Sequence, residues 1–166
     1  MSVVSDTTPL NYLILINAVE VLPKLFGRVY APTAVLEELR DPKSPERVRQ
    51  WAVSPPEWLT VRDPAHLDRS LPTKLGDGEV AVISLAREMH AAVLLDDKDA
   101  RKAAEERKLP MARTLNVLVE AACRDFIDMD EAVSGLRGTT YRAKAEHYQA
   151  SVEQVQERKT SRERDR

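Results

Sequence analysis

Short apolar runs alternate with longer amphipathic stretches along this chain, and a polar turn follows most of the runs. The runs at 2–4, 28–30 and 92–95 have the length of buried strands rather than of helices. The stretches between them carry apolar residues three or four positions apart, which is the spacing of one helix face. The pattern therefore predicts a chain that alternates strand and helix.

Prolines set several limits of the predicted helices. The first helix is expected over 7–26, with Pro23 interrupting it. The second is expected over 32–41, with Pro32 in its first turn and Pro42 ending it. Further helices are predicted over 75–90, 98–108 and 114–125.

The region 41–73 is less regular and contains six prolines. We expect two short amphipathic pieces there, 45–53 and 64–71, around a strand at 57–61. A short fifth strand is predicted near 110–113.

Strand–helix alternation predicts an α/β fold with a mostly parallel sheet of about five strands and helices on both faces. In such sheets ligands bind beyond the carboxyl ends of the strands. We divide the chain into a domain of residues 1–138 and a C-terminal helical extension with a basic tail, 139–166, whose last eight residues are expected to fray. The extension carries an apolar stripe expected to pack on its own domain, with a partner helix or dimer seam as the alternative; its residues are Tyr141, Ala145, Tyr148, Val152 and Val155.

Composition is that of an ordinary globular protein, with 43% hydrophobic and 31% charged residues among 166 and a formal net charge of −2. This net charge does not by itself indicate a nucleic-acid partner. Cys123 is the only cysteine, which excludes a disulfide framework and fits a reducing cytoplasm. The apolar run 12–16 is too short to span a membrane, and no basic segment marks a signal peptide before it.

Acidic residues gather where the predicted strands end. Because the carboxyl ends of parallel strands share one edge, acids far apart in sequence can converge there. Such carboxylates repel one another unless a cation compensates them, and oxygen ligands without His or Cys favour Mg²⁺ or Mn²⁺. The acids concerned are Asp6, Glu37, Glu38, Asp77, Glu79, Asp96 and Asp97.

Five of these acids also have a purely structural interpretation given by their place in the predicted elements. Asp6 could form a turn or cap the first helix, and Glu38 could be a solvated helix residue. Glu79 could simply suit the positive end of its helix dipole. Asp96 and Asp97 could cap the helix that begins near residue 98.

Four segments in order carry a resemblance to a known family: "VVSDTTPLNYL", "VYAPTAVLEEL", "LGDGEVAVISLA" and "AVLLDDKDAR", the last followed by "LPMARTLNVL". Together they resemble the PIN domain, and more narrowly its VapC-like ribonuclease toxin branch. The resemblance covers residues 2–120. It implies a three-layer α/β/α domain and a Mg²⁺- or Mn²⁺-dependent ribonuclease site.

The resemblance assigns catalytic roles to Asp6, Glu38, Glu79 and Asp97. For the fourth acid we favour Asp97 by its distance from the next apolar position, with Asp96 as the close alternative. The implied metal ligands are Asp6, Asp97, Asp96 and Glu79.

Thr8 and Arg101 have supporting or substrate-binding roles by the same resemblance, and Arg113 is given such a role by its expected place at the carboxyl end of the fifth strand. Thr8 corresponds to a hydroxyl residue beside the first acid, and Arg101 to an arginine of this branch. Arg113 and Asn116 depart from the family, which often has glycines there. Arg113 has two interpretations, a guanidinium aimed at a substrate phosphate or a salt bridge to the neighbouring aspartates; Arg101 has the same two.

The implied function is endonucleolytic cleavage of RNA by a metal-activated water, by the cytoplasmic toxin of a toxin–antitoxin pair. The implied partners are an RNA substrate, a small antitoxin protein and a second copy of the chain in a homodimer. A non-catalytic PIN-like binding or scaffold module is the alternative. A phospho-accepting receiver-like domain fits poorly, because it needs an acidic pair after the first strand and a late lysine.

Overall fold

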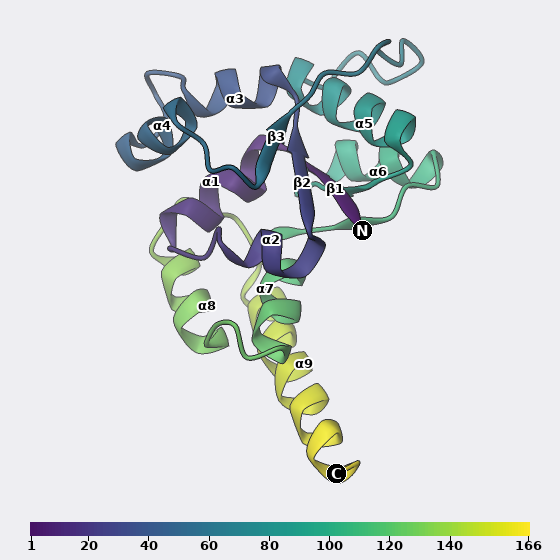
Figure 1. Cartoon of the computed structure of the whole chain (residues 1–166). Helices are drawn as coiled ribbons and strands as arrows, with labels where there is room; N and C mark the ends of the chain where they lie inside the picture. Colours follow the sequence, from purple (N-terminus) through teal and green to yellow (C-terminus); the bar gives the residue numbers. More distant parts are fainter.

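Five parallel strands form the centre of the protein, and the computed structural model describes all residues, 1–166 (Figure 1). The strands are β1 (Ser2–Ser5), β2 (Arg28–Ala31), β3 (Leu59–Val61), β4 (Ala92–Leu94) and β5 (Met111–Ala112). Their order across the sheet is β3-β2-β1-β4-β5, with every pair parallel. The middle strands are buried on both faces, which explains their continuous apolar runs.

Helices cover both faces of this sheet and complete the three-layer α/β/α fold predicted from the sequence. The chain runs outward from β1 to β3 and then reverses, so right-handed connections place the later crossover helices on the opposite face. There α5 packs against β1 and β4, while α1, α2 and α7 pack together on the other face. The helices are α1 (Thr7–Leu15), α2 (Val21–Phe26), α3 (Thr33–Leu39), α4 (Glu46–Val53), α5 (Asp77–Met89), α6 (Lys98–Glu106), α7 (Thr114–Cys123), α8 (Met129–Arg137) and α9 (Ala145–Arg164).

The first predicted helix is in fact two, and the prediction was wrong about the cause of the break. The chain leaves the helix after Leu15 and turns at Asn17, whose φ is +59°, before α2 begins. Pro23 lies inside α2 instead of interrupting it. As the third residue of the helix, it replaces an N–H that would have no partner within the helix.

Other departures concern the irregular stretches. The amphipathic piece predicted at 64–71 is a run of turns, not a helix. The tail expected to fray is instead helical to Arg164. Ion pairs hold it in place, because Lys159 and Arg162 both contact Asp125 and Arg158 contacts Glu120 on α7.

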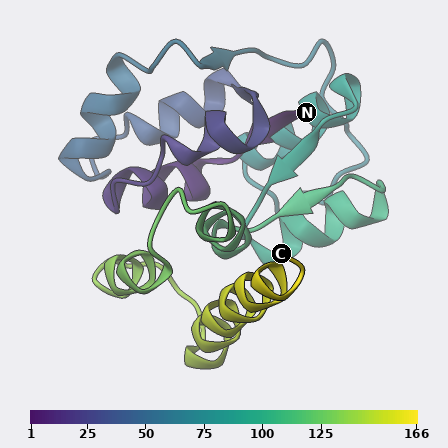
Figure 2. The ribbon, with the colours of Figure 1, turned by 60° about the horizontal axis from the view of Figure 1, so that its bottom comes forward.

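The apolar stripe of the extension packs on the chain's own domain, as expected. Figure 2 shows α9 beside α7 and α8. Tyr148 and Val155 are buried in the same hydrophobic cluster as the sheet and the other helices. Ala145, in contrast, is exposed.

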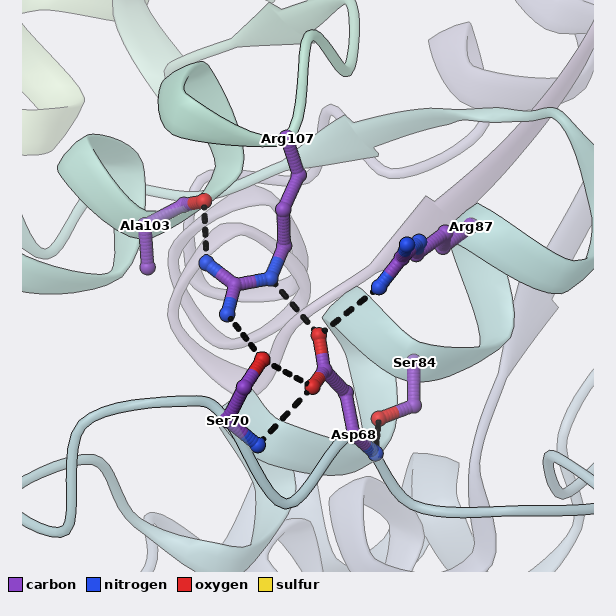
Figure 3. A network of polar contacts seen from close by, with 6 residues as sticks. All are labelled: Asp68, Ser70, Ser84, Arg87, Ala103 and Arg107. Atoms are coloured by element: carbon purple, nitrogen blue, oxygen red, sulfur yellow. Dashed lines mark hydrogen bonds and ion pairs between the residues drawn. The ribbon is translucent and has the colours of Figure 1, made fainter.

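The loop between β3 and α5 is fastened to two helices through Asp68 (Figure 3). Arg107, just after α6, donates from Nε to Asp68 Oδ2 at 2.7 Å, and Arg87 of α5 donates to the same oxygen at 3.2 Å. The Asp68 backbone N–H donates to Ser84 Oγ of α5 at 2.8 Å. The Asp68 and Arg107 side chains are only 11% and 13% exposed. This clasp fixes the segment that leads into α5.

No helix of the protein is both long enough and apolar enough to cross a membrane.

Candidate metal centre

Asp6 lies at the carboxyl end of β1, in the middle of the sheet, and is only 5% exposed. Its backbone N–H donates to the Leu94 carbonyl at 3.1 Å, which fastens the end of β1 to the end of β4. Its side chain does not cap α1, although Asp6 occupies the N-cap position. The structural interpretation of Asp6 as a side-chain cap therefore does not describe this residue.

Glu38 reaches the same edge from α3. Its Oε2 accepts a hydrogen bond of 2.6 Å from Thr7 Oγ1, in the first turn of α1. Its Oε1 lies against Gly78 of α5, where an added Cβ would stand 2.7 Å from that oxygen. The approach of α3 to α5 thus depends on a glycine, one position before Glu79.

Glu79 lies in the first turn of α5 and is partly buried. Its Oε2 accepts from the Gly76 backbone N–H at 3.2 Å. Burial raises the pKa of Glu79, and the nearby carboxylates of Asp97, Glu38 and Asp99 raise it further.

Asp96 follows β4 and is held by three hydrogen bonds. Its Oδ1 accepts from the Thr114 N–H at 3.1 Å and from the Tyr141 hydroxyl at 2.8 Å, and its Oδ2 accepts from Thr114 Oγ1. Burial and the charge of Asp96 raise the pKa of Tyr141, so the phenol stays protonated and donates. Neither partner of Asp96 was predicted from the sequence. Thr114 could have been considered because it follows Arg113, but no sequence pattern connects Tyr141 with Asp96.

Asp97 is exposed and caps α6, with Oδ2 accepting from the Ala100 N–H at 3.0 Å. This is the capping role that the sequence left open. Asp97 nevertheless acts on the site, because its charge raises the pKa of Glu79. Asp96 in turn acts on Asp6. The two neighbouring aspartates thus face different members of the acidic group.

Four carboxylates from different elements meet within electrostatic range at this edge. The pKa of Asp6 is raised to about 7, first because the residue is buried and then because of Glu79, Glu38 and Asp96. The backbone N–H of Thr7 acts in the opposite direction. No ion pair joins any of these acids, or Asp97, to a lysine or arginine.

The donor set suits a hard divalent cation, because it offers only oxygen atoms and an uncompensated negative charge. In this structure no three acidic, His or Cys side chains lie close enough together to hold a metal ion. Binding by several of these acids together therefore requires their side chains to turn towards one another.

The two arginines of interest form no ion pair with the aspartates. Arg113 Nε and Arg101 Nε are both buried without a hydrogen-bond partner. Lys74, instead, pairs with Asp99 at 3.1 Å. Asn116 has a local role, since its Oδ1 accepts from the Arg113 N–H at the start of α7.

Thr8 lines an open hollow of about 390 Å³, together with Thr7, Tyr12 and the acid Glu38. The hydroxyl that contacts an acid is that of Thr7. Sequence reasoning did not single out Thr7, although "SDTTP" offers both threonines.

Comparison with known proteins identifies a family and a solved structure that resemble this chain. A family model described as a PIN domain (DUF3368) matches residues 2–157. A solved PilT N-terminus domain protein from the hyperthermophilic archaeon Sulfolobus solfataricus P2 superposes with a TM-score of 0.53 at 18% identity, covering 73% of this chain and 93% of that one. At this identity the likeness shows a shared fold. No curated protein matches the chain.

Proposed function

Because the chain belongs to the PIN-domain family, we propose that it is a Mg²⁺- or Mn²⁺-dependent endoribonuclease. PIN domains are typically nucleases. The observation that carries the proposal is the meeting of acids from β1, α3, α5 and the end of β4 at one sheet edge, with Asp6 buried among them and no cation paired to any. Repelling carboxylates are costly for folding unless a cation or a proton compensates them, and such costly groupings are typical of functional sites.

In this proposal Asp6, Glu79, Asp96 and Asp97 would hold the metal, with Glu38 as the remaining acid of the catalytic set. A bound Mg²⁺ or Mn²⁺ supplies a water of lowered pKa and polarises a phosphoryl oxygen. Neighbouring side chains hold these acids in place through hydrogen bonds.

Thr7 orients Glu38, while Thr114 and Tyr141 orient Asp96. Arg101 and Arg113 form no ion pair, so we assign their charges to a substrate phosphate.

The finer parts of the proposal come from the VapC-like motifs in the sequence. They are RNA as the substrate, action as the cytoplasmic toxin of a toxin–antitoxin pair, a small antitoxin partner and a homodimer. Cys123 is a free, buried thiol, which is compatible with a reducing compartment.

A non-catalytic PIN-like binding module is the second candidate. It is favoured by one observation, the lack of a closely gathered set of three ligands. The two candidates differ in whether the acids bind a metal together.

The deciding experiment is calorimetric titration of Mn²⁺ into the intact protein and into Asp6→Asn, Asp96→Asn and Asp97→Asn. Asp130→Asn is the matched control, because Asp130 is exposed in the first turn of α8, away from the site. We expect Asp6→Asn to abolish binding, since it removes the central ligand, and Asp130→Asn to leave the affinity unchanged. Comparing the other two variants shows which aspartate contributes more.

A cleavage assay on single-stranded RNA accompanies the titration, with the product ends identified as 5′-phosphate and 3′-hydroxyl. Metal binding that survives Asp6→Asn would contradict the proposed centre. An intact protein that binds RNA but neither binds metal nor cleaves would favour the binding module.

A further inference from the structure

We propose that the cationic hollow beside Asp96, lined by Arg113, Arg142, Lys144 and His147, binds a backbone phosphate of the RNA next to the one that is cleaved. This inference rests on the proposed nuclease function and deepens it. It assigns a substrate-positioning role to the connector between α8 and α9, which lies beyond the sequence motifs quoted for the resemblance.

The hollow is an open depression of about 570 Å³ assembled from two distant parts of the chain. Arg113 comes from the end of β5, and the remaining lining residues come from the connector and the first turn of α9. Three of the lining residues are the basic side chains of Arg113, Arg142 and Lys144, and no carboxylate lines the hollow. A phosphate is the ligand that such a lining attracts.

The cations that line the hollow form no ion pairs, unlike those further along the chain on α9. Arg158, Lys159 and Arg162, further along α9, all form ion pairs with acids at or just after α7. Arg142 and Lys144 form none and are exposed. The charge at the start of α9 is therefore free for a ligand.

Arg113 adds a buried donor to this lining. Its Nε has no hydrogen-bond partner. The Arg113 guanidinium also forms no ion pair, so its charge is not neutralised by a carboxylate and can attract a phosphate into the hollow that it lines.

The position of the hollow ties it to the acidic edge. Tyr141 forms part of its lining and donates to Asp96 Oδ1 at 2.8 Å. On its other side the Tyr141 ring packs edge-on against Tyr12, with 5.0 Å between ring centroids, and Tyr12 lines the hollow that contains Glu38. Of these two hollows, only the one beside Asp96 is lined by cations without any carboxylate. A strand cleaved at the acids would place its neighbouring phosphate over Arg113 and Arg142.

The test is RNA binding without metal, where cleavage is blocked. Fluorescence anisotropy of a labelled, single-stranded RNA of mixed sequence is measured in EDTA over a range of salt concentrations. The variant is Arg142→Gln/Lys144→Gln, and the control is Arg28→Gln/Lys108→Gln, which removes the same charge from two exposed residues at the amino-terminal edge of the sheet.

We expect the Arg142/Lys144 variant to bind RNA several-fold more weakly than the intact protein. Its plot of log affinity against log salt should be shallower by about 0.7 for each phosphate that the variant no longer neutralises. The control should match the intact protein, and both variants should keep its Mn²⁺ affinity.

Equal weakening of RNA binding in both variants would show that only the net charge matters and would overturn the subsite. Unchanged RNA affinity in the Arg142/Lys144 variant would overturn it as well. Neither result touches the nuclease function, which is decided by the metal titration and by cleavage. An intact protein that binds no RNA in EDTA also overturns the subsite, whatever its metal affinity.

Discussion

At the scale of single residues, Asp6 combines a cost in stability with the central place in the proposed site. Its pKa is about 7 in the folded protein against 3.8 for an ordinary aspartate. Between pH 3.8 and about pH 7 the folded protein keeps a proton that the unfolded chain releases. The contribution of Asp6 to the free energy of unfolding therefore falls as the pH rises through this range. The same burial that destabilises the metal-free protein at neutral pH makes Asp6 a strong ligand once a cation is present.

We therefore predict that Asp6→Asn stabilises the metal-free protein at pH 8, by at most about 4 kcal/mol for a shift of this size. At pH 4 the two proteins should differ little, because Asp6 is then protonated in the folded state. Urea unfolding in EDTA at both pH values measures this. Equal stabilities at pH 8 would show that the buried carboxylate carries no such cost.

At Gly78 a substitution should affect RNA cleavage more than it affects stability. An alanine there would favour the helix by up to about 1 kcal/mol, yet its Cβ would stand 2.7 Å from Glu38 Oε1. The end of the Glu38 side chain can move, so we expect Gly78→Ala to leave the unfolding midpoint within a small margin of the original. RNA cleavage should nevertheless drop, because Glu38 is displaced from Thr7.

Gly135→Ala is the comparison for Gly78→Ala, since that helix glycine packs against Ile16, far from the acids. If Gly78→Ala cleaves RNA at the original rate, the position of Glu38 does not matter for the reaction.

At the scale of elements, the clasp at Asp68 decides how firmly the loop before α5 is held. Hydrogen bonds from Ser70 and Arg107 hold the pKa of Asp68 well below its usual range. Such a group adds stability above the unfolded pKa of 3.8, and this stability is lost as pH falls below that value.

Asp68→Asn should therefore destabilise the protein at pH 7 by about 2 kcal/mol, because it leaves the mostly buried Arg107 guanidinium without its anion. The difference from the original should shrink at pH 3. Asp125→Asn is the control, since Asp125 also contacts two cations but is 58% exposed. A larger destabilisation by Asp125→Asn than by Asp68→Asn, in urea unfolding, would show that burial is not what gives the clasp its strength.

Sequence patterns predicted those elements whose local signal agrees with their tertiary setting. The parallel sheet was foreseeable because strands buried on both faces must be continuously apolar. Asp6, Asp96 and Glu79 were foreseeable because the two aspartates follow strands and the glutamate lies in the first turn of a helix. The break at Asn17 was not, because a left-handed residue leaves no periodic signal. The Asp96–Tyr141 bond was not, because it joins residues 45 positions apart through the packing of α9 on α7.

At the scale of the whole molecule, the segment 139–166 is joined to the site as well as to the core. The family model runs to residue 157, past the boundary that we drew at 138. Tyr148 and Val155 are buried in the common hydrophobic cluster, and Tyr141 contacts Asp96.

We predict that a chain ending at residue 138 loses at least about 3 kcal/mol of stability, the value for exposing two large apolar side chains. Thermal unfolding followed by circular dichroism measures this decrease. Tyr141→Phe keeps the packing and removes only the hydroxyl, so it should unfold near the original temperature but bind Mn²⁺ more weakly. A truncated chain with an unchanged midpoint would make the segment a dispensable appendage.

The bond between Tyr141 and Asp96 has a consequence for the order of events during synthesis. Protein chains leave the ribosome from the amino end, so every acid of the site emerges before the phenol that holds Asp96, which follows it by 45 residues. A nascent chain can thus form its sheet while Asp96 is still held only by Thr114. For a protein that we propose cuts RNA, this delay means that the site is completed only after most of the chain has left the RNA-rich ribosome that made it.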